Sequence, residues 1–263
     1  MKQRYFKIVV LLLTACMEAN MFICCSKDDE EYLNVDSDTR EYVDLGLPSG
    51  TLWATCNIGA ISPEKSGNYF AWGETKPKKT YSWDTYRYCK HGGDCIITKY
   101  CPQGYAEHNG FADDKRDLEP EDDAATANWG REWQMPSPSQ LYELVDNNNT
   151  TTTWTTLNGV YGRRITSKTN GNSIFLPAAG NYTEDGISQA GSAGYYWSRK
   201  AYRRWNGESM SLYFSSEYVI TYGDYGYNQR YNGRSVRPVR VLETNYEWPE
   251  SYKAIDDGYH ILK

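Results

Sequence analysis

The sequence predicts a domain of many short strands and polar loops around an aromatic core, with few helices. Two properties of the composition carry this prediction: aromatic residues make up 15% of the 263-residue chain, and the mean hydropathy is −0.74. Short runs that alternate between apolar and polar residues recur between turn-forming residues, whereas a full set of helix start signals is found in one segment.

The strands are expected at both ends of the domain. In the first half we expect strands at 42–45 and 51–56, joined by a turn at 46–50, and a further candidate at 68–72, with a long loop over 76–111. Asn170-Gly171 is a strong hairpin signal between strands at 162–167 and 173–176. The last strands are expected at 195–198, 209–214, 218–222 and 234–241.

The clearest helix signal is the capping box Ser137-Pro138-Ser139-Gln140, which has a proline at the first helical position. The apolar stripe of this helix is formed by Leu141, Leu144 and Val145, and 147–149 ends it. A shorter helix is expected over 124–127, capped by Asp122.

The N-terminal residues are typical of an exported lipoprotein. A basic start precedes an apolar run at 8–15 that is too short to span a bilayer. Cys25 is the favoured lipidated residue, because the acidic stretch after it resembles the tether of surface-exported lipoproteins of the Bacteroidota. Cys16 is the alternative, since Leu-Thr-Ala-Cys matches the bacterial lipobox, and cleavage without lipidation also stays open. The expected segments are a signal peptide (1–24), an acidic flexible tether (25–40), a domain (41–242) and a C-terminal tail (243–263), and the expected location is the outer-membrane surface.

Charge and cysteine content limit the partners. A net charge of −6 argues against nucleic acid as a partner, and the membrane is expected to be contacted only through the lipid anchor. Among Cys89, Cys95 and Cys101 we expect one disulfide, either Cys89–Cys95 or Cys89–Cys101. A zinc site with His91 is the weaker alternative, because paired C-x-x-C spacing is missing. No metal and no cofactor are predicted.

No catalytic residues are predicted, and the protein is not expected to be an enzyme. The three histidines, His91, His108 and His260, are interpreted as surface residues rather than members of a triad. The acidic cluster over 117–123 could supply a glycosidase pair or a calcium site, but helix capping and a solvated face explain it more simply.

The tract 194–231 is the main candidate for function. It holds nine of the 24 tyrosines, interleaved with Gly, Ser, Asn and Arg, a composition typical of recognition surfaces. Its rings and guanidinium groups could stack on a ligand or contact carboxylates. The predicted ligand-binding residues are Arg199, Tyr202, Arg203, Arg204, Trp205, Asn206, Tyr213, Tyr222, Tyr225, Tyr227 and Arg230.

Several motifs, in order along the chain, resemble the Fibrobacter succinogenes major paralogous domain (FISUMP) family. They are YVDLGLPSGTLWATCN at 42–57, FAWGE at 70–74, DDAA at 122–125, WQMP at 133–136, IFLPAAG at 174–180, YWS at 196–198 and SVRPV at 235–239. The resemblance implies an α+β fold of the C-type-lectin-like type, related to formylglycine-generating enzymes. The late cysteines of those enzymes are missing, and neither 119–121 nor 205–207 matches the calcium-dependent sugar motifs of true C-type lectins.

This resemblance also implies a binding role. In similar proteins the tract before the R-P-V strand is diversified by retroelements, so 199–206 and 222–231 are interpreted as a ligand-display surface. The expected partner is an extracellular glycan or protein. The alternatives are a structural module of a cell-surface complex that docks through 243–263 and, with least support, a carboxylate-based glycoside hydrolase.

Overall fold

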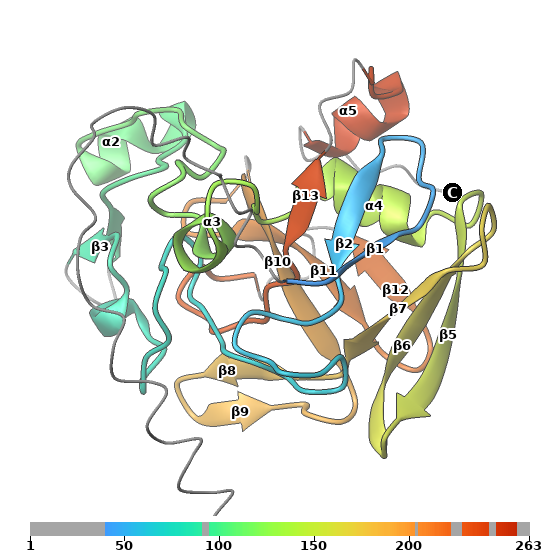
Figure 1. Cartoon of the computed structure of the whole chain (residues 1–263). Coiled ribbons are helices and arrows are strands. Elements are labelled where there is room, and N and C mark those ends of the chain that lie inside the picture. Colours follow the sequence, from blue (N-terminus) through green and yellow to red (C-terminus); the bar gives the residue numbers. More distant parts are fainter. Residues whose placement is uncertain (1–39, 91–94, 203–204, 222–227, 242–245, 257–263) are drawn as a thin grey trace, which may run out of the picture. The chain divides into compact units, whose positions relative to one another are not determined.

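Short antiparallel strands and a few short helices build the described part of the chain, which is an α+β arrangement as expected (Figure 1). The structure is a computed structural model that describes residues 40–90, 95–202, 205–221, 228–241 and 246–256. The strands are β1 Tyr42–Asp44, β2 Thr51–Ala54, β3 Cys89–Lys90, β4 Ile96–Ile97, β5 Thr150–Leu157, β6 Val160–Ser167, β7 Ser173–Pro177, β8 Asn181–Thr183, β9 Gly186–Ser188, β10 Gly194–Ala201, β11 Ser209–Phe214, β12 Val219–Thr221 and β13 Val239–Val241.

The helices are short and lie between the strands. They are the 3₁₀ helices η1 Trp83–Thr85 and η3 Gln103–Tyr105 and the α-helices α2 Ala106–Asn109, α3 Ala124–Trp129, α4 Pro138–Val145 and α5 Glu250–Asp256. No described helix has the length and apolar character needed to span a bilayer.

The strands form three three-stranded sheets and two hairpins. Their orders are β1-β2-β13, β5-β6-β7 and β10-β11-β12, with β3-β4 and β8-β9 as the two-stranded pairs. In the first sheet β2 is central and fully buried, and Trp53 pairs with Val43 on one side and Val239 on the other. The two ends of the described chain therefore meet in one sheet.

The helix and hairpin predictions that rest on local signals are confirmed. Ser137 Oγ accepts from Gln140 N at 3.1 Å and Gln140 Oε1 accepts from Ser137 N at 2.8 Å, which completes the capping box of α4. The hairpin of β6 and β7 flanks Asn170-Gly171. The cap of α3 is Asp123 rather than Asp122, because the Asp123 carboxylate accepts from two amides at the start of that helix.

Several expectations for strands need correction. The loop expected over 76–111 contains β3 and β4, and β8 and β9 lie outside the expected strands. β5 was not expected, although Asn158-Gly159 joins it to β6 with positive φ at both residues, the turn chemistry that two-residue hairpins favour. In 68–72 only Phe70 forms a bridge, to Arg234, so no strand forms there. The strand expected at 234–241 is confined to β13, and the residues before it run through the interior.

The tryptophans of the recognised motifs form the core. Trp53, Trp72, Trp133 and Trp197 are each 0% exposed. Trp72 Nε1 donates to the carbonyl of Ser198 and Trp197 Nε1 to that of Phe70, both at 2.9 Å. These reciprocal bonds fix β10 against 70–72, so the motif residues act through packing and hydrogen bonding.

Buried arginines link the strands to one another. Arg237 is 1% exposed, and its guanidinium donates to Asn57 Oδ1 at 2.9 Å and to the carbonyls of Ala54, Thr55 and Phe175 at 3.1, 3.0 and 2.9 Å. Burial lowers the pKa of Arg237. One side chain thus joins the end of β2 to β7.

We predict that Arg237→Met lowers the free energy of unfolding by at least about 3 kcal/mol, because several buried acceptors lose their donor and each orphaned group costs about 1–3 kcal/mol. Urea unfolding of the purified protein measures this loss. The matched control is Arg164→Met, at an exposed position of β6, with an expected change within about 0.5 kcal/mol. Equal effects of the two substitutions would contradict the account.

Candidate functional site

The Tyr/Arg-rich surface predicted from the sequence is not a single exposed patch. Tyr202 and Arg230 are 1% and 0% exposed, so the prediction that they face solvent is wrong. Tyr202 packs against Met210 and Ile255, and Arg230 lies 4.8 Å over the Trp72 ring. Five other predicted members lie outside the described residues: Arg203, Arg204, Tyr222, Tyr225 and Tyr227.

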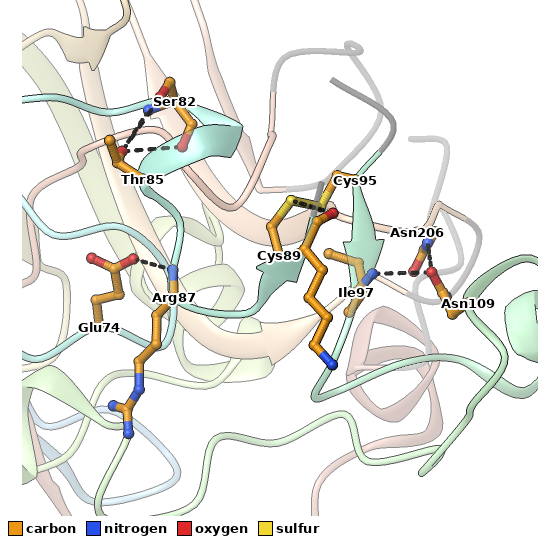
Figure 2. The surroundings of a disulfide bond; sticks show 10 residues. Glu74, Ser82, Thr85, Arg87, Cys89, Cys95, Ile97, Asn109 and Asn206 are labelled. Carbon is orange, nitrogen blue, oxygen red and sulfur yellow. Dashed lines mark hydrogen bonds between the residues drawn. A yellow bond between two sulfur atoms is a disulfide. The ribbon is translucent and has the colours of Figure 1, made fainter. Parts of the chain in front are cut away.

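Trp205 and Asn206 lie in the connection between β10 and β11. Trp205 is 57% exposed. Asn206 is half-buried, and its Nδ2 donates to Asn109 Oδ1 at 3.1 Å, an oxygen that also accepts from Ile97 N at 3.0 Å (Figure 2). Asn109 therefore joins this connection to β4, and Asn206 is held by the protein rather than offered to a ligand.

Tyr213 lies in a row of tyrosines near the other end of β11. Its ring is 4.8 Å from that of Tyr195 and 5.9 Å from that of Tyr218. Tyr213 is half-buried, and Tyr218 is 48% exposed. Trp205 and Tyr218 precede and follow β11, so the exposed rings lie at opposite ends of this strand.

The Cys89–Cys95 pairing, one of the two expected, is present as a disulfide that closes the β3–β4 hairpin, with Cα atoms 5.4 Å apart (Figure 2). Cys101 is buried and free, and burial raises the pKa of its thiol. Within the described ranges, no group of three or more His, Cys, Asp or Glu side chains could hold a metal ion. His91 of the zinc alternative lies outside those ranges.

The acidic cluster is partly a buried, neutralised network, whereas Asp117 and Glu121 are exposed. Asp122 is 1% exposed, and its oxygens accept from Tyr88 Oη at 2.5 Å, Tyr100 Oη at 2.7 Å and Lys99 Nζ at 2.6 Å. Hydrogen bonds from Lys115 and Lys99 lower the pKa of Glu119 to about 2. Asp122 and Glu119 are therefore engaged by side chains of the protein itself.

A polar pocket of about 260 Å³ lies beside the N-terminus of α4, and we call it the α4 pocket. Its walls come from the turn before β2, the segment before α4, β10 and the C-terminal segment 246–256; Figure 1 shows α4 beside β2, β13 and α5. The hydroxyl and amide side chains that line it are Ser49, Thr51, Gln134, Ser137 and Gln140.

The floor of the pocket is a connected hydrogen-bond chain. Ser49 N donates to Glu143 Oε1 at 2.9 Å, and Ser49 Oγ lies 2.6 Å from Thr51 Oγ1. Gln140 Nε2 donates to Thr51 Oγ1 at 3.1 Å, while Gln140 Oε1 accepts from Ser137 N at 2.8 Å. Because these groups are already ordered, a ligand that binds them does not bear the entropic cost of fixing them.

The C-terminal segment forms one wall because α5 docks on α4. Ile255 is 0% exposed, Tyr252 Oη donates to Asp146 Oδ2 at 2.8 Å, and Asp256 Oδ1 accepts from Ser139 N at 2.9 Å. The sequence signal for α5 is the proline directly before Glu250, which is typical of a helix start.

Trp248 and Tyr246 supply the aromatic part of that wall. The Trp248 ring is stacked 5.6 Å from Tyr252 and meets Tyr246 edge-on at 5.1 Å. Both Tyr246 and Trp248 line the pocket and are half-exposed. Neither was predicted as a site residue, because they become neighbours of the floor only through the docking of α5.

Arg199 is the predicted binding residue that the structure places in this pocket. Its Nη1 donates to Gln134 Oε1 at 2.6 Å. Its Nε lies 3.4 Å from Asp117 Oδ1 but makes no hydrogen bond with a described residue. The guanidinium is therefore held at Nη1, while Nε is buried and has no hydrogen bond within the described residues.

Glu143 lies under the floor and is 0% exposed. Burial raises its pKa above the ordinary value of about 4.5, although the two hydrogen bonds from Ser49 oppose this. Burying the ionised Glu143 carboxyl therefore lowers stability at neutral pH, while its hydrogen bonds hold the Ser49 turn in place.

No family model matches this chain, and no significant match was found among curated proteins or solved structures. The FISUMP resemblance and the lectin-like fold that it implies therefore stay predictions.

We predict that Glu143→Gln changes the pH dependence of stability. The folded protein binds the Glu143 proton more tightly than the unfolded chain does, so wild type loses unfolding free energy as pH rises above about 4.5. The variant lacks this loss, and its stability relative to wild type should increase with pH by about 1.4 kcal/mol for each pKa unit of elevation. Urea unfolding of both proteins between about pH 4 and about pH 8, a range that begins near the ordinary carboxyl pKa, measures the difference in unfolding free energy. A difference that stays constant or falls as pH rises would contradict the assignment.

Proposed function

We propose that this protein is a surface-anchored lipoprotein that binds an extracellular glycan in the α4 pocket and does not act as an enzyme. The observation that carries the proposal is that two aromatic rings, Tyr246 and Trp248, line the same pocket as a pre-ordered set of hydroxyl and amide groups. The pyranose ring of a sugar has an apolar C–H face and a polar rim of hydroxyl groups. Aromatic rings complement the face, and fixed donors and acceptors complement the rim.

The charged groups of the pocket favour binding over cleavage. A glycosidase of the usual kind needs two carboxyl groups on either side of the scissile bond. Among the described lining residues Asp256 is the one carboxylate, and it is engaged by Ser139 N at 2.9 Å and lies 3.7 Å from Lys200 Nζ. Such a carboxylate is suited to accept hydrogen bonds from a ligand.

The anchor and the fold family are part of the same proposal. The signal-like N-terminus and the acidic tether support lipidation at Cys25, with Cys16 as the alternative. The motifs at 42–57 and 235–239 support a C-type-lectin-like fold of the FISUMP type. A structural role through a free tail is less well supported, because 246–256 pack on α4.

A second candidate, a protein ligand bound by the β10–β11 connection, is favoured by the exposed ring of Trp205. The residues that flank the predicted display segments are tied together: Glu208 bridges to Gln229, and Arg230 N donates to the carbonyl of Gly207 at 2.8 Å. Both segments therefore start from one rigid frame, as ligand display requires.

We predict that Trp248→Ala weakens glycan binding about tenfold, or about 1.4 kcal/mol, because a stacking surface is lost. Glycan-array screening of the purified protein, followed by titration calorimetry of the best binder, measures this. The matched control is Trp205→Ala, which removes an exposed tryptophan outside the pocket and should leave glycan binding unchanged. If Trp205→Ala abolishes binding and Trp248→Ala does not, the site lies at the β10–β11 connection instead.

A further inference from the structure

Two of the described residues that line the α4 pocket are charged, Arg199 and Asp256, and they differ in how fully they are engaged. The Asp256 carboxylate accepts from Ser139 N and lies 3.7 Å from Lys200 Nζ. The Arg199 guanidinium makes its hydrogen bond to the neutral oxygen of Gln134. Its carboxylate contact is Asp117, at 3.4 Å, and the Asp117 side chain is 49% exposed. An exposed ion pair of this kind is weak, so Arg199 is the less satisfied charge.

Charges of both signs lie around the pocket. Arg116, Arg199 and Lys200 lie near the carboxylates Asp117 and Asp256, and the Glu143 carboxyl lies under the floor. Arg116 Nη2 donates to the Asp256 carbonyl at 3.0 Å. The group that an anionic ligand would meet is therefore Arg199, whose hydrogen bond goes to a neutral amide.

We infer that the α4 pocket recognises an acidic sugar, with the sugar carboxylate on the Arg199 guanidinium and the sugar ring against Trp248; this inference rests on the proposed glycan binding. A guanidinium presents parallel N–H donors that match the two oxygens of a carboxylate. The aromatic wall lines the same pocket as this donor. A simple anion would contact Arg199 but not the aromatic wall. A neutral sugar would contact the wall, and Arg199 would keep only its exposed ion pair with Asp117.

The size of the pocket agrees with one sugar residue. Pockets for drug-sized ligands are about 300–1,000 Å³, and the α4 pocket is about 260 Å³. The floor groups nearest to the ring hydroxyls would be Ser137 and Gln140, which keep a small exposed surface. Asp256 offers an acceptor for the hydroxyl donors of a sugar.

The test compares acidic sugars with their own methyl esters, because esterification removes the charge and keeps the sugar. The probes are digalacturonate, a glucuronate-terminated disaccharide and sialyllactose, each as free acid and as methyl ester, titrated calorimetrically into the full chain. We expect at least one acid to bind about tenfold more tightly than its ester, on the order of one charge-assisted hydrogen bond. Arg199→Gln should reduce the affinity for that acid to the level of the ester.

Two further variants separate charge from geometry and from folding. Arg199→Lys keeps the charge but not the planar donor pair, so its affinity for the acid should fall between wild type and Arg199→Gln. Arg164→Gln, at an exposed position of β6, should bind as wild type does. Thermal unfolding of each variant checks that the fold is retained, and Arg199→Lys carries the test if Arg199→Gln unfolds.

The outcomes distinguish this inference from the function on which it rests. Esters that bind as tightly as acids would overturn the acidic specificity and leave glycan binding standing. Acid binding that is unchanged in both Arg199 variants would overturn the role of Arg199. Binding of no acid and no ester would overturn the inference together with the proposed glycan binding.

Discussion

The buried guanidinium of Arg237 is the interaction on which the rest of the structure depends. A buried charge needs its donors satisfied, and here the acceptors are Asn57 and the carbonyls of Ala54, Thr55 and Phe175. Those acceptors come from segments more than a hundred residues apart. The chain can bury Arg237 only when the end of β2 and β7 are both in place, which couples these segments. Arg234 is buried in a similar way. Its guanidinium lies 4.1 Å from the centre of the Trp197 ring, and burial lowers its pKa to about 9.

The segments that Arg237 couples are connected directly to the residues of the α4 pocket. Two residues after Arg237, Val239 exchanges backbone hydrogen bonds with Gln134, at 2.9 and 3.0 Å. Gln134 in turn holds Arg199, and the capping box of α4 begins three residues later at Ser137. The positions of Gln134, Ser137 and Arg199 are therefore set by the core, and the proposed site depends on this rigidity.

Local signals in the sequence predicted the local elements. Ser137 and Gln140 identify the start of α4, and Asn170-Gly171 identifies the β6–β7 hairpin, because each signal depends on hydrogen bonds between near neighbours. Asn158-Gly159 carried the same information for β5 and was overlooked, since the threonine-rich run before it lacks alternation with apolar residues.

The candidate site could not be predicted in the same way. Its groups, among them Ser49, Arg199 and Trp248, are separated by up to two hundred residues, and no local pattern specifies that they meet. Composition indicated both Arg199, which lines the pocket, and Arg230, which is buried, and could not separate them. An arginine stacked on a buried tryptophan and an arginine in a pocket have the same local sequence character. Tyr202 was placed on the surface because the docking of α5 was not foreseen.

The most direct test of the central claim is a crystal structure of the protein with an acidic disaccharide bound. The account predicts that the sugar lies in the α4 pocket, with its ring on Trp248, its carboxylate on Arg199 and α5 still docked on α4. A sugar bound at Trp205 instead, or an α4 pocket filled by the protein's own side chains, would contradict it.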